Sequence, residues 1–160
     1  MKLSLVKDKE RIRKYPELFG LSVCKGVPLY ILAENIFYTL MDKMVTDNKS
    51  SFYDFFNLEY ESKDLEYLDE EDSVEVNGFL PISSMNGHVE LKNSFGTEAF
   101  VTCKTASIIV WVSALEQIAS IPEIHDFIRE NLYRTISVIK SSYHDFVAPE
   151  DIDKVYSFFD

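Results

Sequence analysis

The feature that most constrains the fold is the stretch from Thr105 to Ile121, which contains the longest mainly apolar run and the only tryptophan, Trp111. Lys104 and Glu116 flank this run so closely that it is too short to cross a bilayer, which needs about 20 apolar residues. Its Ile-Ile-Val segment would also suit a buried strand, but the length of the stretch and its helix-favouring tail indicate a helix. We therefore expect a buried central helix on which the other elements pack.

Three further helices are expected from local sequence patterns. Between Pro28 and Thr46, apolar residues recur at steps of three and one, which is the spacing of one buried helix face. A second helix is expected to open at Ser120-Ile121-Pro122-Glu123, a capping box in which the serine bonds a first-turn amide, and to run to about Tyr143. A last helix is expected to start at Ala148-Pro149-Glu150, because proline suits a first helical turn.

The middle third of the chain is expected to hold a small antiparallel β element. Val74 and Val76 indicate a strand, Asn77-Gly78 indicates a turn or a bulge, and residues 88–91 alternate like a second strand. Pro81 limits any assignment to a central strand, since proline has no amide proton to donate. The expectation is a hairpin or a three-stranded sheet within residues 73–93.

Other stretches are less decided by their sequence. Residues 2–6 and 95–102 each remain open between strand and helix, and a short helix capped by Ser50 or Ser51 is expected through residues 52–56. We therefore expect an α+β fold: an α-rich single domain over residues 1–160, with a small antiparallel β element in the middle third. The expected core includes Leu32, Ile36, Leu40, Ile108, Trp111, Val112, Leu115, Ile128, Leu132 and Ile139.

The net charge of −11 is concentrated in the middle of the chain. The segment from Glu59 to Glu75, which we name the acidic–aromatic stretch, contains nine acids and one lysine. Phosphate binding needs clustered Lys and Arg, so this charge argues against a nucleic-acid partner. An acidic surface instead favours a basic protein partner.

No catalytic or metal-binding motif of usable specificity is present. The cysteines and histidines are scattered, with neither the Cys-x-x-Cys nor the His-Glu-x-x-His spacing of zinc sites, and Asp69-Glu70-Glu71-Asp72 lacks the glycine of an EF-hand loop. Ser137-Val138-Ile139-Lys140 matches a Ser-x-x-Lys pattern without its companion motifs. We therefore expect no metal, no cofactor and no enzymatic activity. An enzyme with no recognisable motif, using Cys24 or a histidine, remains an alternative.

The start of the chain bears on its location. Leu3-Ser4-Leu5-Val6 is too short for the apolar core of a signal peptide, so we expect a cytoplasmic protein that does not associate with membranes. In that reducing compartment, Cys24 and Cys103 are expected to be free core thiols.

Tyrosines interleaved with the carboxylates distinguish the acidic–aromatic stretch from a plain run of charge. Such a composition suits an interface in which aromatic side chains bury area while charge steers a basic partner. A solvated surface without a partner is the alternative. The candidate partner-binding residues are Tyr60, Asp64, Glu66, Tyr67, Asp69, Glu70, Glu71 and Asp72.

With this stretch, its small size, its acidity and its lack of catalytic motifs, the chain resembles bacterial toxin-immunity proteins of contact-dependent inhibition and colicin systems. Such proteins bind and block a cognate toxin domain, often a basic nuclease. The resemblance implies occlusion, with carboxylates from Glu66 to Asp72 in place of phosphates at the toxin's basic cleft and with Tyr60 and Tyr67 as anchors. A regulatory or adaptor domain that binds a basic protein other than a toxin is the alternative.

Overall fold

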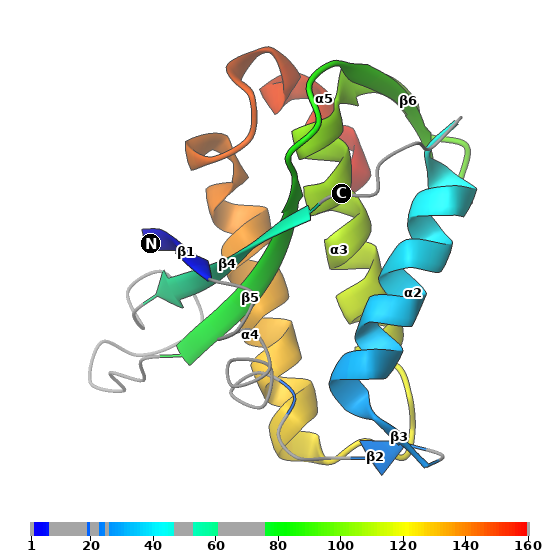
Figure 1. Cartoon of the computed structure of the whole chain (residues 1–160), viewed down its shortest axis with the longest axis vertical. Helices are drawn as coiled ribbons and strands as arrows, with labels where there is room; N and C mark the ends of the chain where they lie inside the picture. The colour runs from blue at the N-terminus through cyan, green and yellow to red at the C-terminus, as the bar shows by residue number, and fades with distance from the viewer. Residues whose placement is uncertain are drawn as a thin grey trace.

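The elements of this computed structural model form a mixture of helices and small antiparallel sheets, which is the α+β fold expected from the sequence (Figure 1). The structure describes residues 2–6, 19, 23–24, 26–46, 53–60 and 76–159. In chain order the elements are β1 (Lys2–Val6), β2 (Val23–Cys24), β3 (Val27–Pro28), α2 (Leu29–Met44), β4 (Tyr53–Tyr60), β5 (Val76–Ser83), β6 (His88–Lys92), β7 (Glu98–Thr102), α3 (Cys103–Ala119), α4 (Asp126–Ser142), the 3₁₀ turns η2 (Tyr143–Asp145) and η3 (Pro149–Asp151), and α5 (Ile152–Phe159).

Helix α3 occupies the centre, as its apolar sequence predicts, and lies between α2 and α4 (Figure 1). Trp111 is fully buried, and its ring packs edge-on against Phe37 of α2 with 5.7 Å between ring centroids. The helix begins slightly earlier than predicted, because Thr102 acts as its N-cap and accepts a hydrogen bond from the amide of Thr105. The expected central helix is thus confirmed.

A three-stranded antiparallel sheet of order β1-β4-β5 packs against α3 and α4 through β5. Residues 2–6 are therefore a strand, in which Val6 lies opposite Phe55 of β4. At the end of β5, the amide of Ser83 donates a hydrogen bond to Ser107 Oγ of α3 at 2.9 Å. This bond ties the sheet to the central helix.

Two predictions in this region are wrong. A helix was expected through residues 52–56, but residues 53–56 belong to β4, whose aromatic side chains favour a strand and whose backbone pairs on both sides, with β1 and β5. Phe52 lies outside the described residues. Asn77-Gly78 is neither a turn nor a bulge, because β5 runs straight through it with Gly78 opposite Leu58. Pro81 lies in β5 opposite Phe55. Among the described strands β5 forms an edge of the sheet, which suits a proline because it has no amide proton to donate to a further strand.

Strands β6 and β7 form a separate hairpin. The expected strand over residues 88–91 is confirmed, and the undecided segment 95–102 contains strand β7. The expectation of one hairpin or sheet within residues 73–93 is wrong, because β5 pairs with β4, whereas β6 pairs with β7. Pairing partners far along the chain decided this arrangement, and local alternation carries no information about them.

Helix α2 is confirmed close to its predicted bounds, but its buried face is narrower than the expected apolar stripe. Leu32 and Ile36, which were expected in the core, are only half-buried. The apolar stripe is wider than the surface that α2 shares with α3, so part of it remains at the edge of the contact. The buried residues of α2 are Leu29, Ala33, Phe37, Leu40, Met41 and Met44.

Helix α4 begins later than predicted, at Asp126. The N-cap is His125, whose Nδ1 accepts a hydrogen bond from the amide of Phe127 at 3.1 Å. The capping box expected at Ser120 is wrong, because this serine ends α3 and donates its hydroxyl to the carbonyl of Glu116 at 2.8 Å. The helix nevertheless ends at Ser142, near the predicted end, and its predicted core residues Ile128, Leu132 and Ile139 are buried.

The last helix is confirmed, with Pro149 in the first turn of η3 before α5. Val155 of this helix is buried, whereas its neighbour Tyr156 is largely exposed. Cys24 and Cys103 are free and buried, as predicted. In the part of the chain that the structure describes, no helix is both long and apolar enough to span a membrane.

Candidate interaction surfaces

The acidic–aromatic stretch is anchored at one end of the three-stranded sheet. Tyr60 is the last residue of β4 and lies opposite Val76, the first residue of β5. Both ends of the stretch therefore emerge from neighbouring strands. The other seven candidate residues lie outside the described ranges, so their role in partner binding stays a prediction: Asp64, Glu66, Tyr67, Asp69, Glu70, Glu71 and Asp72.

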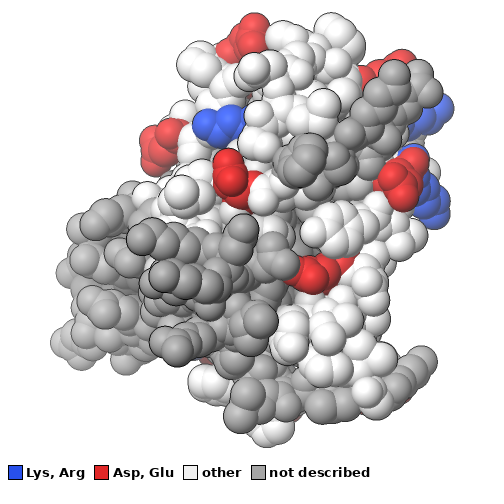
Figure 2. All heavy atoms as spheres, viewed as in Figure 1, with Lys and Arg blue, Asp and Glu red and all other residues white. Residues whose placement is uncertain are grey.

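Acidic side chains of the described residues do not gather into one patch on the face seen in Figure 2, where uncharged surface separates them. Nine of the 27 acids of the chain instead belong to the acidic–aromatic stretch. The strongest negative charge is thus a property of that segment and not of the described surface in this view.

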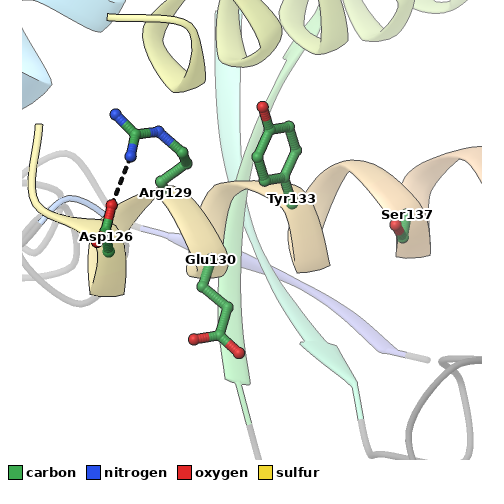
Figure 3. Close-up of a pocket in the computed structure, with 5 residues that line it drawn as sticks. All are labelled: Asp126, Arg129, Glu130, Tyr133 and Ser137. Atoms are coloured by element: carbon green, nitrogen blue, oxygen red, sulfur yellow. Dashed lines mark hydrogen bonds and ion pairs between the residues drawn. The ribbon is translucent and has the colours of Figure 1, made fainter. Parts of the chain in front are cut away.

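A shallow hollow of about 360 Å³ lies along one side of α4 and is lined by Asp126, Arg129, Glu130, Tyr133 and Ser137 (Figure 3). All five residues belong to a single helix. Figure 3 shows the side chains of Tyr133 and Glu130 extending away from each other, so their polar groups do not converge on one point. The hollow is therefore a surface that another molecule could contact, and it lacks the converging polar groups of a catalytic pocket.

The guanidinium of Arg129 is bound by groups of this chain and is not free to bind a partner. Its Nε donates a hydrogen bond to the carbonyl of Ala119 and its Nη2 to that of Ile121, each at 2.9 Å. Nη1 forms an ion pair with Asp126 at 2.6 Å. The guanidinium therefore binds the carbonyl of Ala119, which the end of α3 leaves without a helical partner, and a carbonyl of the turn that follows, so it fixes the turn from α3 to α4.

Exposed aromatic side chains mark two places on the described surface. Phe127 and Tyr133 of α4 are 63% and 49% exposed, and Phe95 and Phe100 of the β6–β7 hairpin are 93% and 60% exposed. Aromatic side chains are enriched at the centres of protein interfaces. None of the four was a candidate from the sequence, because no local pattern distinguishes an exposed phenylalanine from a buried one.

The three histidines have separate structural surroundings. His88 stacks on Phe100 with ring centroids 5.3 Å apart, and its Nε2 lies 3.3 Å from Glu150 Oε1. His125 caps α4, as described above, and His144 is an exposed residue of η2. Among the described residues, no group of three His, Cys, Asp or Glu side chains could hold a metal ion.

Cys103 and the two residues of the Ser-x-x-Lys pattern also have separate surroundings. Burial raises the pKa of the Cys103 thiol, which outweighs the opposing effect of a backbone hydrogen bond, so this thiol is not activated as a nucleophile. Lys140 Nζ binds Glu116 of α3 at 2.8 Å, whereas Ser137 lines the hollow on α4. The Ser-x-x-Lys pattern is therefore two surface residues with different contacts.

Asp151, at the end of η3, is a buried charge that was not among the residues expected from the sequence. Its Oδ2 accepts hydrogen bonds from Thr105 Oγ1 at 2.6 Å, from Thr102 Oγ1 at 2.8 Å and from the Thr102 amide at 3.1 Å. Burial alone would raise the pKa of this carboxyl, but the hydrogen bonds from Thr105 and Thr102, with the charge of Lys154, outweigh burial and hold the pKa below its ordinary value. Its sequence neighbours Glu150 and Asp153 are exposed acids, so no local signal singled it out.

Comparison with protein-family models finds no match, and a search of curated proteins finds no significant match. A search of solved structures finds a match to the KlcA and ArdB proteins, described as having a novel fold and antirestriction activity against Type I DNA restriction systems in vivo but not in vitro. The match covers 99% of this chain and 94% of that chain, with a TM-score of 0.69 and 18% sequence identity. At this identity the likeness is one of fold, and the chain is therefore similar in fold to the KlcA and ArdB antirestriction proteins.

Proposed function

We propose that this protein is a non-catalytic inhibitor that acts against a DNA restriction system by binding one of its proteins. The observation that carries the proposal is the structural likeness to the KlcA and ArdB proteins, which extends over almost the full length of both chains. A likeness of this extent involves the whole arrangement of helices and sheets rather than one common motif. Because fold alone does not imply function, the activity needs its own test.

The charge of the chain supports this proposal. Enzymes that act on DNA bind phosphates through clustered Lys and Arg, so their DNA-binding surfaces are basic. A chain of net charge −11 is complementary to such a surface, and long-range attraction would speed encounter. In this proposal the acidic–aromatic stretch provides that attraction, and its tyrosines provide buried contact.

The deciding experiment is carried out in cells, because the activity of the structural neighbour is described in vivo but not in vitro. The protein is expressed in bacteria that carry an active type I restriction system, and the plating efficiency of unmodified phage is measured. We expect expression to raise plating efficiency in these bacteria and to leave it unchanged in an isogenic strain without the restriction system. Unchanged plating in the restricting strain, with folded protein present, would refute the proposal.

A charge-reversed variant tests the role of the acidic–aromatic stretch. Reversing Glu66, Asp69, Glu70 and Asp72 to lysine should abolish protection if these carboxylates steer the partner. The matched control reverses four exposed acids elsewhere, so that both variants change net charge equally. These control residues are Glu90, Glu98, Glu123 and Asp153. Equal effects of the two variants would show that total charge matters and the stretch does not.

Toxin immunity is the second candidate function, favoured by the acidity of the segment from Glu59 to Glu75. An immunity protein would protect cells from a toxin encoded beside it, whether or not a restriction system is present. Co-expression with the product of the adjacent gene separates the two candidates. Rescue from that product without any effect on phage plating would replace the antirestriction proposal with immunity. A non-toxin basic partner would bind the protein with no effect in either assay.

A further inference from the structure

A cleft of about 670 Å³ opens between the β6–β7 hairpin, the C-terminal end of α2, the second half of α3 and the end of α5. The isolated bridge between Val45 and Leu91 holds the end of α2 against β6, and residues next to the bridge, Met44, Thr46 and Lys92, line the cleft. Phe158 and Phe159 of α5 line the cleft as well. Its volume lies within the range of about 300–1,000 Å³ that is usual for small-molecule sites.

One side of the cleft is formed by the polar stripe of an otherwise buried helix. Ser113, Glu116, Gln117 and Ser120 all line the cleft, and their spacing places them on one face of α3 and its cap. The rest of this half of α3 is buried in the core. The central helix therefore presents hydrogen-bonding groups to the cleft on the single side where it is not covered by apolar side chains.

Three lysines line this cleft in a protein of net charge −11. Lys140 is paired with Glu116 at 2.8 Å between Nζ and Oε1. Within the described residues, neither Lys43 of α2 nor Lys92 of β6 forms an ion pair, and both are exposed. Glu116 is the one acid in the lining and is already paired with Lys140, so the lining holds two further lysines that form no ion pair with an acid of the cleft.

Phe95 is held at the rim of the cleft by a structured turn. The side-chain Oδ1 of Asn93 accepts hydrogen bonds from the amides of Phe95 at 3.0 Å and Thr97 at 2.9 Å, and Gly96 adopts a φ of +86°. The turn therefore positions an aromatic ring that is 93% exposed. A ring fixed in this way loses little conformational entropy when a ligand stacks on it.

We propose that this cleft binds a nucleotide-sized aromatic anion, which is a phosphate attached to a planar base. Lys43 and Lys92 would hold the phosphate as point charges, as lysine does in other phosphate sites. Phe95 would stack on the base, and the polar stripe of α3 would meet its edge with donors and acceptors. The proposal concerns a small ligand and does not depend on the antirestriction function.

Charge favours a small anion over a nucleic-acid strand in this cleft. A strand of DNA adds a negative charge with each nucleotide, and the parts outside the cleft would meet the field of a chain that carries a net charge of −11. A mononucleotide places its whole charge next to Lys43 and Lys92. The expected order of affinity is therefore mononucleotide above single-stranded oligonucleotide.

The test titrates adenosine 5′-monophosphate into ¹⁵N-labelled full-length protein and follows amide shifts by NMR. We expect shifts concentrated in residues 92–97 and 113–120, with weaker binding of adenosine, which lacks the phosphate, and of inorganic phosphate, which lacks the ring. Lys43→Ala and Lys92→Ala should each weaken binding about tenfold, and so should Phe95→Ala. Raising salt should weaken binding by the wild type.

Matched controls are provided by exposed residues outside the cleft, Lys104→Ala for the lysines and Phe127→Ala for Phe95. Both controls should bind adenosine 5′-monophosphate with wild-type affinity. The proposal is overturned if the nucleotide produces no shifts at millimolar concentration, or if Lys43→Ala, Lys92→Ala and Phe95→Ala bind as well as their controls. It is also overturned if inorganic phosphate binds as tightly as the nucleotide, because the ring would then contribute nothing.

Discussion

Asp151 is a fully buried carboxylate that joins the start of α3 to the turn before α5. Replacing it with asparagine removes the charge that Thr105 and Thr102 stabilise, at nearly unchanged volume. We expect Asp151→Asn to lower the free energy of unfolding by about 1–3 kcal/mol at neutral pH, because buried donors lose a charged acceptor. Urea unfolding followed by circular dichroism measures the change. Asp153→Asn, an exposed acid in the same region, is the control and should have little effect.

The same residue predicts a pH dependence. Its pKa in the folded protein lies below its ordinary value, so the stabilisation from its charge is present above an ordinary pKa of about 3.9. That stabilisation is lost as the pH falls through the lower folded pKa. The difference in stability between wild type and Asp151→Asn should therefore shrink below about pH 4. A difference that stays constant down to pH 2 would mean that packing, and not charge, accounts for the role of Asp151.

At the scale of elements, the joint between α3 and α4 depends on Arg129. Its Nε satisfies the carbonyl of Ala119, which the end of α3 leaves without a helical partner, and its Nη2 binds the carbonyl of Ile121 in the turn that follows. We expect Arg129→Met to keep the aliphatic packing but to cost about 1–3 kcal/mol of stability, through the loss of these charged hydrogen bonds. Thermal unfolding gives the value, and hydrogen exchange of amides near residues 119–126 should show faster local opening.

Asp126→Asn provides the control for this joint. Asp126 pairs with Arg129 on the outside of the turn and is itself 94% exposed at its side chain, so removing its charge should cost less than about 1 kcal/mol. If the two variants are equally destabilised, the surface ion pair, and not the bonds to the end of α3, would be the source of the stability.

The β6–β7 hairpin depends on contacts from α5 and η3 along its outer strand. Lys154 Nζ donates a hydrogen bond to the carbonyl of Phe100 at 2.7 Å, and Asp151 accepts one from the amide of Thr102. These two side chains occupy backbone groups that an unprotected edge strand would offer to another chain. Residues near the end of the chain thus protect a strand formed some fifty positions earlier.

At the scale of the whole molecule, a net charge of −11 on 160 residues predicts that repulsion lowers stability at low ionic strength. Raising salt from about 0.1 M to about 1 M shortens the Debye length from about 10 Å to about 3 Å and screens this repulsion. We expect the melting temperature to rise over this range. Sodium and potassium chloride should act alike, since the effect is one of screening.

The variant with Glu66, Asp69, Glu70 and Asp72 reversed to lysine is the control for this effect, because it moves the net charge from −11 to −3. Its melting temperature should depend less on salt than that of the wild type. A melting temperature of the wild type that falls as salt rises would show that attractive ion pairs outweigh the overall repulsion.

The helical part of the fold follows from local sequence. The run around Trp111 is too apolar to be anything but core, and the stripe between Pro28 and Thr46 has the period of one buried face. These signals are carried by residues one or two turns apart, and for that reason the sequence predicts the helices α2, α3 and α5. The sequence predicts less well which residues of a helix are buried, since Leu32 and Ile36 belong to the apolar stripe of α2 but are only partly buried.

What depends on partners far along the chain was decided by the tertiary structure alone. The first residues of β4 were expected to be helical, and their pairing with β1 and β5, which lie far along the chain, makes them a strand. The same holds for the burial of Asp151, which depends on Thr102 and Thr105, and for the cleft that unites Lys43 and Lys92 with α3. Sequence by itself determines the period of an element and the charge of a segment, because both are sums over neighbouring residues. Which strands pair, which charge is buried and which side chains share a cleft is determined only when distant elements meet in space.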